Sequence, residues 1–453
     1  MGRLFGTDGV RGIANTELSC MQAFENGRAA ASLLSENSRR RPVFVIGGDT
    51  RCSTPMLMRA VSAGLCSVGA DVIDLGIIPT PAVSYLVEKY KADAGVVVSA
   101  SHNPYQYNGI KLFGGNGQKL PDLLEERIEA IVLDKINALP TPTGDDIGRI
   151  LPSYDAAEKD YIDHIKSSVM FSLDGMRIAL DCANGAASRT AKRLFTELGA
   201  EVLILSADPD GTNINRDCGS THLEKLAAFV RENGCDCGAA FDGDADRCLC
   251  VDENGDFIDG DRIMAICALD LAARGRLHGN TVVGTVMTNL GFIKFCEQNG
   301  LRFVATNVGD RFVLEEMLIG EYSFGGEQSG HIIFRDFAKT GDGQLTAAQL
   351  FSLVRRSGKP LSELASVMTS YPQTIVNISV SKEGKLQFFT DPTIKEAIDS
   401  AKAELGDDGR VVVRPSGTEP LIRIMVEGKD KEVIVTIAAR IAETINSALG
   451  QKA

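Results

Sequence analysis

The sequence predicts three similar α/β domains with mixed, largely parallel sheets, followed by a C-terminal α+β domain, all around a central cleft. Three observations lead to this prediction. Strand-like and helix-like segments alternate, one strand–helix–strand unit recurs three times, and a further strand in each copy ends in an unusual polar loop. The chain of 453 residues has room for about three domains of ordinary size, and its 44% hydrophobic content can fill large cores.

The recurring unit is a short apolar strand, a loop rich in Gly, Asp and Asn, a helix, and a Gly-rich step into a second strand. Its three copies occupy residues 42–80, 176–211 and 280–310. In the first copy, Ser53-Thr54-Pro55 has the composition of a helix start, with proline in the first turn. Strands that alternate with helices in this way indicate β-α-β units and parallel strand pairs.

A further apolar strand in each copy runs into a polar loop. The three stretches read "AGVVVSASHNP" at 94–104, "CGAAFDGDADR" at 237–247 and "YSFGGEQSGH" at 322–331. In open α/β sheets, ligands bind beyond the carboxyl ends of the strands. Three polar loops from equivalent strand ends therefore predict one composite cleft.

The predicted domains cover residues 1–150, 151–252, 253–368 and 369–453. Residues 139–153 form a linker broken by Pro and Gly, and Asn254-Gly255 predicts a tight hairpin at the second junction. The final domain reads as a strand, a helix, two strands and a closing helix. These elements are expected at 374–380, 392–405, 409–415, 421–428 and 431–449.

Charge and composition indicate a cytoplasmic protein. The net charge of −13 argues against nucleic acid or an anionic membrane as a partner, and no apolar run approaches the roughly 18 residues of a spanning helix. The N-terminus lacks the apolar core of a signal peptide. The 11 cysteines are an odd number and indicate reduced thiols. Cys235, Cys237, Cys248 and Cys250 could imitate a zinc site, but their i, i+2 spacing favours buried strand residues.

The loop "DGDADR" offers the most specific chemistry. It places Asp242, Asp244 and Asp246 at alternate positions, where their charges would repel unless a hard divalent cation lay among them. Oxygen-only ligands indicate Mg²⁺. An EF-hand is the rival, with Glu253 at its twelfth position, but its sixth position is Arg247 instead of Gly and its flanks look like strands. A solvated acidic turn is the other alternative.

Ser101, in "SASHNP", is the candidate nucleophile or phosphate carrier. A phosphoserine brings about −1.5 to −2 charges, so it could lie beside three aspartates only with a cation between them. A bridging Mg²⁺ would neutralise the phosphoryl group and make its phosphorus electrophilic. The serine lacks a GxSxG context, and the chain lacks a Walker A loop, which disfavours acyl transfer and an NTP motor.

Two further loops suit a phosphorylated polyol. "GGEQSGH" offers the carboxylate, hydroxyl and imidazole of Glu327, Ser329 and His331. "RPSGTEP" offers a guanidinium fork, hydroxyls and backbone amides for a dianion, from Arg414, Ser416, Gly417 and Thr418. The first of these loops, taken alone, could be a plain turn. Some of the basic residues near strand ends would offset the charge of such a substrate; the candidates are Arg11, Arg51, Lys111 and Arg247.

The motifs "FGTDGVRG", "SASHNP" with "NGIK", "DGDADR", "GEQSGH" and "RPSGTEP" occur in the order seen in the α-D-phosphohexomutase superfamily. The resemblance covers essentially the whole chain. It implies that Ser101 carries the transferable phosphoryl group and binds one Mg²⁺ with Asp242, Asp244 and Asp246. It gives acid/base or charge-supporting roles to Lys111, His331, Arg11 and Arg247. It assigns sugar hydroxyls to Glu327 and Ser329, and the second phosphate to Arg414, Ser416, Gly417 and Thr418.

Within the superfamily, "GTNINRDCGSTH" and "GEQSGH" resemble the branch that acts on glucosamine phosphates. The resemblance implies reversible conversion of glucosamine 6-phosphate to glucosamine 1-phosphate, which would feed amino-sugar nucleotide and cell-wall precursor synthesis. A sugar 1,6-bisphosphate would be the intermediate or the activator, and a homodimer is possible. The alternatives are a phosphomannomutase/phosphoglucomutase, an Mg²⁺-dependent phosphatase, and a sugar-phosphate sensor without turnover.

Overall fold

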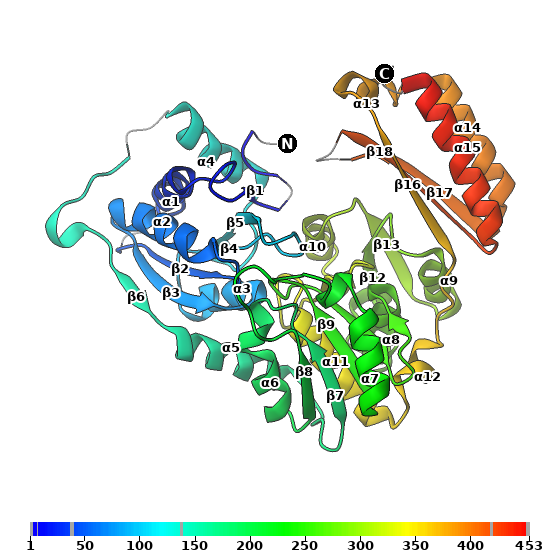
Figure 1. Cartoon of the computed structure of the whole chain (residues 1–453), viewed down its shortest axis with the longest axis horizontal. Helices are drawn as coiled ribbons and strands as arrows, with labels where there is room; N and C mark the ends of the chain where they lie inside the picture. The colour runs from blue at the N-terminus through cyan, green and yellow to red at the C-terminus, as the bar shows by residue number, and fades with distance from the viewer. Residues whose placement is uncertain (1–2, 7, 37–39, 136–138, 417–419, 450–453) are drawn as a thin grey trace.

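The computed structural model describes residues 3–6, 8–36, 40–135, 139–416 and 420–449, and these residues form four sheets (Figure 1). The sheets contain six, five, four and three strands, and each with its helices is here called unit 1, 2, 3 or 4 in chain order. The fold therefore has the predicted class, three α/β units and a C-terminal α+β unit. None of the described helices combines the length and apolar character needed to cross a membrane.

Unit 1 has the strand order β1-β5-β4-β2-β3-β6. Its strands are β1 (Val10–Ile13), β2 (Val43–Gly48), β3 (Asp71–Ile77), β4 (Ala94–Val98), β5 (Tyr107–Gly114) and β6 (Ile150–Pro152). Its helices are α1 (Cys20–Leu34), α2 (Thr54–Ser67), α3 (Thr80–Lys89) and α4 (Asp122–Asp134). As predicted, α2 begins directly after Ser53 with a proline in its first turn.

Units 2 and 3 repeat the central part of this sheet. Unit 2 contains β7 (Arg177–Asp181), β8 (Glu201–Leu205), β9 (Cys237–Phe241), β10 (Cys248–Asp252) and β11 (Phe257–Ile258), with α5 (Tyr154–Ser168), α6 (Ala191–Glu197) and α7 (Glu224–Asn233). Unit 3 contains β12 (Thr281–Thr285), β13 (Arg302–Thr306), β14 (Phe324–Gly326) and β15 (Ile332–Phe334). Its helices are α8 (Gly260–Ala273), α9 (Leu290–Gln298), α10 (Asp310–Ile319), α11 (Gly343–Ser357) and α12 (Leu361–Ala365).

The predicted repeat is confirmed by the strand orders β3-β2-β4-β5, β8-β7-β9-β10 and β13-β12-β14-β15. In each copy the first three strands are parallel and the fourth is antiparallel to its neighbour. Each polar loop connects the third and fourth strands of its copy. All three loops therefore leave the carboxyl end of an equivalent buried strand.

Two local predictions also hold. The Asn254-Gly255 turn joins β10 to β11 as an antiparallel pair, with Gly255 at φ 86°, and thereby extends the sheet of unit 2. The four cysteines suspected of imitating a zinc site are buried on or next to β9 and β10, as expected for apolar strand residues. Burial raises the pKa of the Cys237 thiol well above its usual value, which keeps that thiol protonated.

Unit 4 has an antiparallel sheet in the order β16-β18-β17, with helices packed against it. It contains β16 (Gln373–Ser379), α13 (Lys382–Gln387), α14 (Pro392–Leu405), β17 (Gly409–Pro415), β18 (Leu421–Gly428) and α15 (Lys431–Leu449). Sequence reasoning found each of these elements except the short helix α13. Figure 1 shows unit 4, in orange and red, beside α9 and β13 and apart from unit 1.

The hydrophobic cores divide the molecule differently from the sheets. One continuous buried cluster includes residues of units 1, 2 and 3, among them Val83, Leu180 and Phe324. Unit 4 has a separate cluster of its own, between its sheet and α14 and α15. Because a shared close-packed core resists displacement, units 1 to 3 form one platform on which the polar loops are fixed.

Candidate active site

The loops of units 1 and 2 meet at Ser101. Its Oγ donates a hydrogen bond of 2.6 Å to Asp242 Oδ2, although 141 positions separate the two residues. Ser101 follows β4 and Asp242 follows β9, so both lie at carboxyl ends of equivalent strands. Both are 1% exposed. The structure thus joins the serine to the acidic loop, as the sequence predicted.

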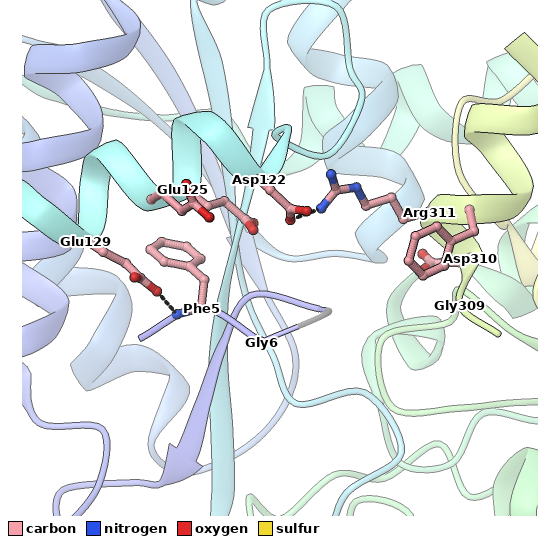
Figure 2. A pocket seen from close by; sticks show the side chains of 10 residues that line it. Phe5, Gly6, Asp122, Glu125, Glu129, Gly309, Asp310 and Arg311 are labelled. Carbon is pink, nitrogen blue, oxygen red and sulfur yellow. Dashed lines mark hydrogen bonds and ion pairs between the residues drawn. The ribbon is translucent and has the colours of Figure 1, made fainter. Parts of the chain in front are cut away.

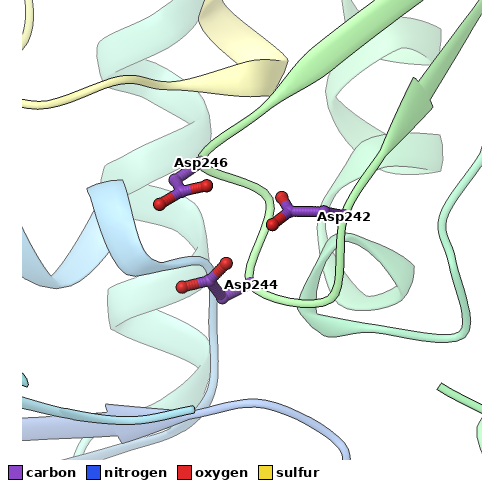
Figure 3. Close-up of side chains that lie close together, drawn as sticks. All are labelled: Asp242, Asp244 and Asp246. Carbon is purple, nitrogen blue, oxygen red and sulfur yellow. The ribbon is translucent and has the colours of Figure 1, made fainter. Parts of the chain in front are cut away.

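The three aspartates of the second loop converge. Figure 3 shows the carboxylates of Asp242, Asp244 and Asp246 turned toward a shared space, and one oxygen of each lies within 4.8 Å of the others. The loop is flanked by β9 and β10, so the helical flanks of an EF-hand are absent there. Burial, and then the charges of the other two acids, raise the pKa of Asp242 well above its usual value.

This arrangement fits a hard divalent cation. The Oδ1 atoms of Asp244 and Asp246 are buried and have no hydrogen-bond partner. Unsatisfied buried carboxylate oxygens are costly unless a cation occupies the space between them. The three residues are at most 5% exposed, which rules out the alternative of a solvated acidic turn. The oxygen-only donor set, with Ser101 Oγ beside it, is typical of an Mg²⁺ site.

Lys111 lies against the same acids. Pairing of β5 with β4 sets Lys111 opposite Val97, next to the serine loop. Its Nζ is 2.9 Å from Asp244 Oδ2, 3.1 Å from Asp8 Oδ2 and 3.8 Å from Asp246 Oδ2. Burial would lower the pKa of Lys111, but these three carboxylates outweigh it and raise the pKa above its usual value. Lys111 is therefore a buried ammonium ion.

His331 is placed between two carboxylates. Its Nδ1 is 3.6 Å from Asp246 Oδ2, and its Nε2 is 3.5 Å from Asp310 Oδ2. The backbone N–H of Gly341 donates to Nε2 at 2.8 Å, so the neutral ring carries its proton on Nδ1, facing Asp246. Burial opposes the charged ring, but the two carboxylates raise the pKa of His331.

The arginines predicted for the site lie on both sides of the acids. The backbone N–H of Arg247 donates to Asp242 Oδ1 at 3.2 Å, and its side-chain Nε is 3.9 Å from Asp246 Oδ1. Arg11 pairs with Asp8 and also reaches Asn103 Oδ1 at 3.5 Å. Both guanidinium groups can thus meet an anion that approaches the serine loop.

Several of these residues line a cavity of about 860 Å³ between units 1, 2 and 3. Ser101, Lys111, Asp242 and Asp244 are buried and are not part of the wall that the structure describes. Its charged and imidazole-bearing walls are Asp8, Arg11, His102, Lys119, Asp246, Arg247, Asp310, Glu327 and His331. Glu327 Oε1 accepts the backbone N–H of Gly309 at 3.1 Å, and burial raises the pKa of its carboxyl group. Ser329 belongs to the same loop as Glu327 but is not part of the wall that the structure describes.

Sequence reasoning missed four of the charged or imidazole-bearing residues that line this cavity. His102 and Asp8 stood inside quoted motifs but received no role, whereas Lys119 and Asp310 carried no signal beyond their position near strand ends. Lys119 forms ion pairs with Asp8 of unit 1 and Asp310 of unit 3. Burial, and then Arg247 and Arg11, lower the pKa of His102 to about 4, so its ring is neutral beside Ser101 Oγ, at 3.4 Å.

The N-terminal segment at Phe5 is held by α4, as Figure 2 shows. The carboxylate of Glu129 accepts the backbone N–H groups of Arg3, Leu4 and Phe5 at 2.9, 2.7 and 2.6 Å. At the other end of α4, Asp122 pairs with Arg311 of unit 3. A cavity of about 210 Å³ lies between these contacts. Glu125 lines it, and burial raises the pKa of Glu125 to about 7.

The described residues of the predicted phosphate-binding loop lie outside the wall of the cavity of about 860 Å³. Arg414 is on β17 opposite Arg423, and burial together with that like charge lowers the pKa of Arg414. The carbonyl of Ser416 accepts a hydrogen bond from Lys385 Nζ at 2.7 Å. Within the described part of the chain, no residue of unit 4 lines the cavity. The other two predicted residues, Gly417 and Thr418, lie outside the described residues.

The comparison with protein families agrees with this architecture. Four domain families match in order: the phosphoglucomutase/phosphomannomutase alpha/beta/alpha domain I at residues 2–138, domain II at 159–255, domain III at 259–371 and the C-terminal domain at 375–444. The chain therefore belongs to the phosphoglucomutase/phosphomannomutase family, the α-D-phosphohexomutase superfamily that its motifs resemble.

Relatives from several bacteria are named phosphoglucosamine mutase. The proteins of Thermoanaerobacter sp. and Acetivibrio thermocellus are 55% and 52% identical to this chain; each comparison covers 99% of this chain and 100% of the relative. Among solved structures, a phosphoglucomutase/phosphomannomutase family protein from Burkholderia thailandensis has a TM-score of 0.83 at 23% identity. That match covers 99% of this chain and 98% of the other, and it shows that the fold is shared.

Proposed function

We propose that this chain is an isomerase that interconverts glucosamine 6-phosphate and glucosamine 1-phosphate through a phosphoryl group carried on Ser101. The observation that carries the proposal is the buried contact between Ser101 Oγ and the acidic loop, 2.6 Å from Asp242 Oδ2. His102 and Asp246, from the same two loops, line a cavity large enough for a phosphorylated sugar. The choice of sugar is supported by the relatives named phosphoglucosamine mutase, 52–55% identical over the whole chain.

The proposed cycle has two transfers. In the first, the bond between phosphorus and Ser101 Oγ breaks and a bond between phosphorus and the sugar O1 forms. The O1 hydroxyl gives its proton to a base of the site, and the released Ser101 Oγ takes up a proton. The resulting sugar 1,6-bisphosphate turns around without leaving. In the second, the bond between phosphorus and O6 breaks, the phosphoryl group returns to Ser101 Oγ, and O6 takes the proton. In the chain without a phosphoryl group, Asp242 accepts the Ser101 hydroxyl proton in a hydrogen bond and thereby orients its oxygen.

We propose that Asp242, Asp244, Asp246 and an oxygen of Ser101 hold one Mg²⁺ in each chain. When bound, the ion would neutralise the phosphoryl group and make its phosphorus more electrophilic. The buried, unpartnered oxygens of Asp244 and Asp246 support this assignment. Burying three carboxylates close together costs free energy unless positive charge offsets it, and a bound cation would supply that charge.

The basic residues are proposed to stabilise the negative charge of the phosphoryl group and to transfer protons. Lys111, kept protonated by its three carboxylate neighbours, would stabilise the transferring phosphoryl group and could give a proton to a departing oxygen. His331 would exchange protons with the sugar hydroxyl, because its ring faces the cavity and its protonated form is favoured by Asp310 and Asp246. Arg247 and Arg11 would hold phosphate oxygens from either side.

The remaining contacts belong to the sugar and its second phosphate. We propose that Glu327 and Ser329 bind sugar hydroxyls. The second phosphate would be bound by Arg414, Ser416, Gly417 and Thr418. Since the described part of that loop stands outside the cavity, unit 4 has to close over a bound substrate, which would also exclude water. We further propose that the four units are domains bounded near residues 150, 252 and 368.

A direct assay tests this function. The purified chain, with Mg²⁺ and a trace of glucose 1,6-bisphosphate as phosphoryl donor, is incubated with glucosamine 6-phosphate and followed by ³¹P NMR. The proposal expects a new glucosamine 1-phosphate signal and a gain of one phosphoryl group on the peptide that contains Ser101. Faster turnover of glucose or mannose 6-phosphate would instead indicate the phosphoglucomutase/phosphomannomutase activity.

Two other results would contradict the proposal. Net release of inorganic phosphate without isomerisation would indicate a phosphatase, in which water takes the phosphoryl group from Ser101. Binding without any turnover would indicate a sugar-phosphate sensor. The matched control is Ser167→Ala, which removes an exposed hydroxyl of α5 and is expected to leave the rate unchanged.

A further inference from the structure

Asn215 occupies an unusual position in the loop that follows β8. It lies in the "GTNINRDCGSTH" stretch, does not line the cavity, and has a left-handed backbone at φ 58°. Asparagine tolerates this conformation better than most residues. Its backbone N–H donates to the carbonyl of Ala183 at 2.9 Å, which fixes the residue against the loop after β7. The Asn215 side chain is thereby presented to unit 1.

The side-chain amide of Asn215 holds the loop that carries the nucleophile. Its Nδ2 donates to the backbone carbonyl of Ser101 at 2.8 Å and to that of Asn103 at 3.2 Å. Ser101 itself has φ 51°, a conformation that a residue other than glycine adopts only when its surroundings impose it. The hydrogen bonds from unit 2 are therefore part of what keeps Ser101 in this geometry.

Arg51 grips the same carbonyls from within unit 1. Its Nη2 donates to the carbonyls of Ser101 and Asn103, each at 2.8 Å, and its Nη1 to that of Pro104 at 2.5 Å. Its Nε is fixed by Asp49 Oδ2 at 2.9 Å, and both side chains are fully buried. Arg51 thus fixes the conformation of the serine loop from within unit 1, whereas Asn215 links that loop to unit 2.

The metal-binding loop reaches the same point. A side chain at Gly243, between Asp242 and Asp244, would place its Cβ 2.6 Å from the carbonyl oxygen of Ser101 and 2.9 Å from Asn215 Nδ2. Only a glycine leaves space for these two groups. The serine loop, Asn215 and the acidic loop therefore meet in one close-packed junction.

We infer that Asn215 is a positioning residue that holds Ser101 Oγ in register with the three aspartates across the boundary between units 1 and 2. The inference rests on the proposed function, since register between Ser101 and the acids matters for phosphoryl transfer. Displacement of a reacting group by about 1 Å can reduce a rate by about 100-fold. Asn215 does not border the cavity, so its loss affects the transfer step and not substrate binding.

The test uses two substitutions of Asn215. Asn215→Asp keeps the shape and the tolerance for a left-handed backbone but replaces the donor with an oxygen that repels both carbonyls. Asn215→Gly keeps the backbone and removes only the amide. We expect kcat to fall by roughly 10- to 100-fold in Asn215→Asp and by about tenfold in Asn215→Gly, with KM for the sugar phosphate within about twofold of the unsubstituted chain. The control Asp217→Asn alters an exposed left-handed residue of the same loop and should leave both constants unchanged.

A second readout does not depend on turnover. Amide hydrogen exchange of residues 99–105 in the full chain should be faster in both Asn215 variants than in Asp217→Asn, because two of the bonds that hold the loop are lost. Unchanged kcat and unchanged exchange in a folded Asn215→Gly would overturn the inference, as would a rise in KM at constant kcat. If the unsubstituted chain has no mutase activity but exchange still rises, the proposed function fails and the positioning role stands.

Discussion

Units 1 to 3 and unit 4 hold the two halves of the proposed site in different ways. Ser101 and the acids lie in a platform whose three units share a core, and Asp242 and Asp244 are held by buried partners. Arg414 and Ser416 stand on a unit with its own core, outside the cavity wall. Unit 4 is anchored at its base, where Glu427 accepts the N–H of Leu290 and Arg410 binds the carbonyl of Thr288.

This difference places the residues proposed for phosphoryl transfer in the platform and the residues proposed to bind the second phosphate in unit 4. Groups that must meet within tenths of an ångström are fixed before substrate arrives, which avoids reorganisation during the transfer. The groups proposed to hold the non-reacting phosphate stand on a separate unit, where they would close on either orientation of a bisphosphate. Substitutions in the platform should therefore reduce kcat, and those in unit 4 should raise KM.

The largest effect is expected at the nucleophile. Ser101→Ala removes the proposed phosphoryl carrier, and we expect kcat to fall by at least about 1000-fold, since the covalent intermediate cannot form without this oxygen. The melting temperature should change little because the methyl group fits the same space. Steady-state rates and the mass of the protein after incubation with glucose 1,6-bisphosphate check this. A variant that still turns over at the normal rate would refute the covalent relay.

The next effect is expected at the acids. Asp244→Asn weakens the proposed metal site and removes a charge from Lys111, so we expect about a 100-fold lower rate at fixed Mg²⁺. Mg²⁺ at about 100 times its dissociation constant should stabilise the unsubstituted chain by about 2.7 kcal/mol and the variant by much less. Thermal unfolding with and without Mg²⁺ measures this difference. Asp208→Asn, at an exposed loop position, is the control, and equal Mg²⁺ responses in both variants would contradict the site.

A smaller effect with a different signature is expected in unit 4. Arg414→Ala should raise KM for the sugar phosphate by roughly 10- to 100-fold, the range expected for lost hydrogen bonds to a charged group, with less change in kcat. Full kinetic curves separate the two constants. The exposed Lys431→Ala on α15 should behave as the unsubstituted chain. A fall in kcat at constant KM would show that the two halves of the site are not divided as described.

The smallest effect concerns the contact between units 1 and 3. Burial raises the pKa of Glu125 from 4.5 to about 7, so the folded chain binds this proton more tightly than the unfolded chain. The resulting stabilisation is complete below about pH 4.5 and is lost as pH rises through about 7. Glu125→Gln should therefore gain roughly 1–3 °C in melting temperature, relative to the unsubstituted chain, between pH 5 and pH 8. Glu126→Gln, an exposed neighbour, should show no such trend; a trend equal in both variants would exclude Glu125 as its source.

Much of the fold followed from local patterns. Apolar runs, glycine-rich turns and one recurring strand–helix–strand unit predicted three α/β units and a distinct last unit, because these patterns reflect burial and backbone geometry that neighbouring residues largely determine. The helix α13 was missed, since its six residues are too few to show a helical period. The strand β11 also joined the sheet of unit 2 through a turn that the sequence could locate but not assign to a sheet.

The sequence by itself also predicted that Ser101 and three alternate aspartates lie together, because a serine after a buried strand and a cluster of carboxylates suit a phosphoryl group and a cation. It could not show that Asp8, Lys119, Asp310 and Asn215 belong with them. Each of these residues is an ordinary polar residue in its own segment, and its partners come from other units. Only the tertiary structure decided those contacts, because electrostatic and hydrogen-bonding interactions depend on distance in space and not on distance along the chain.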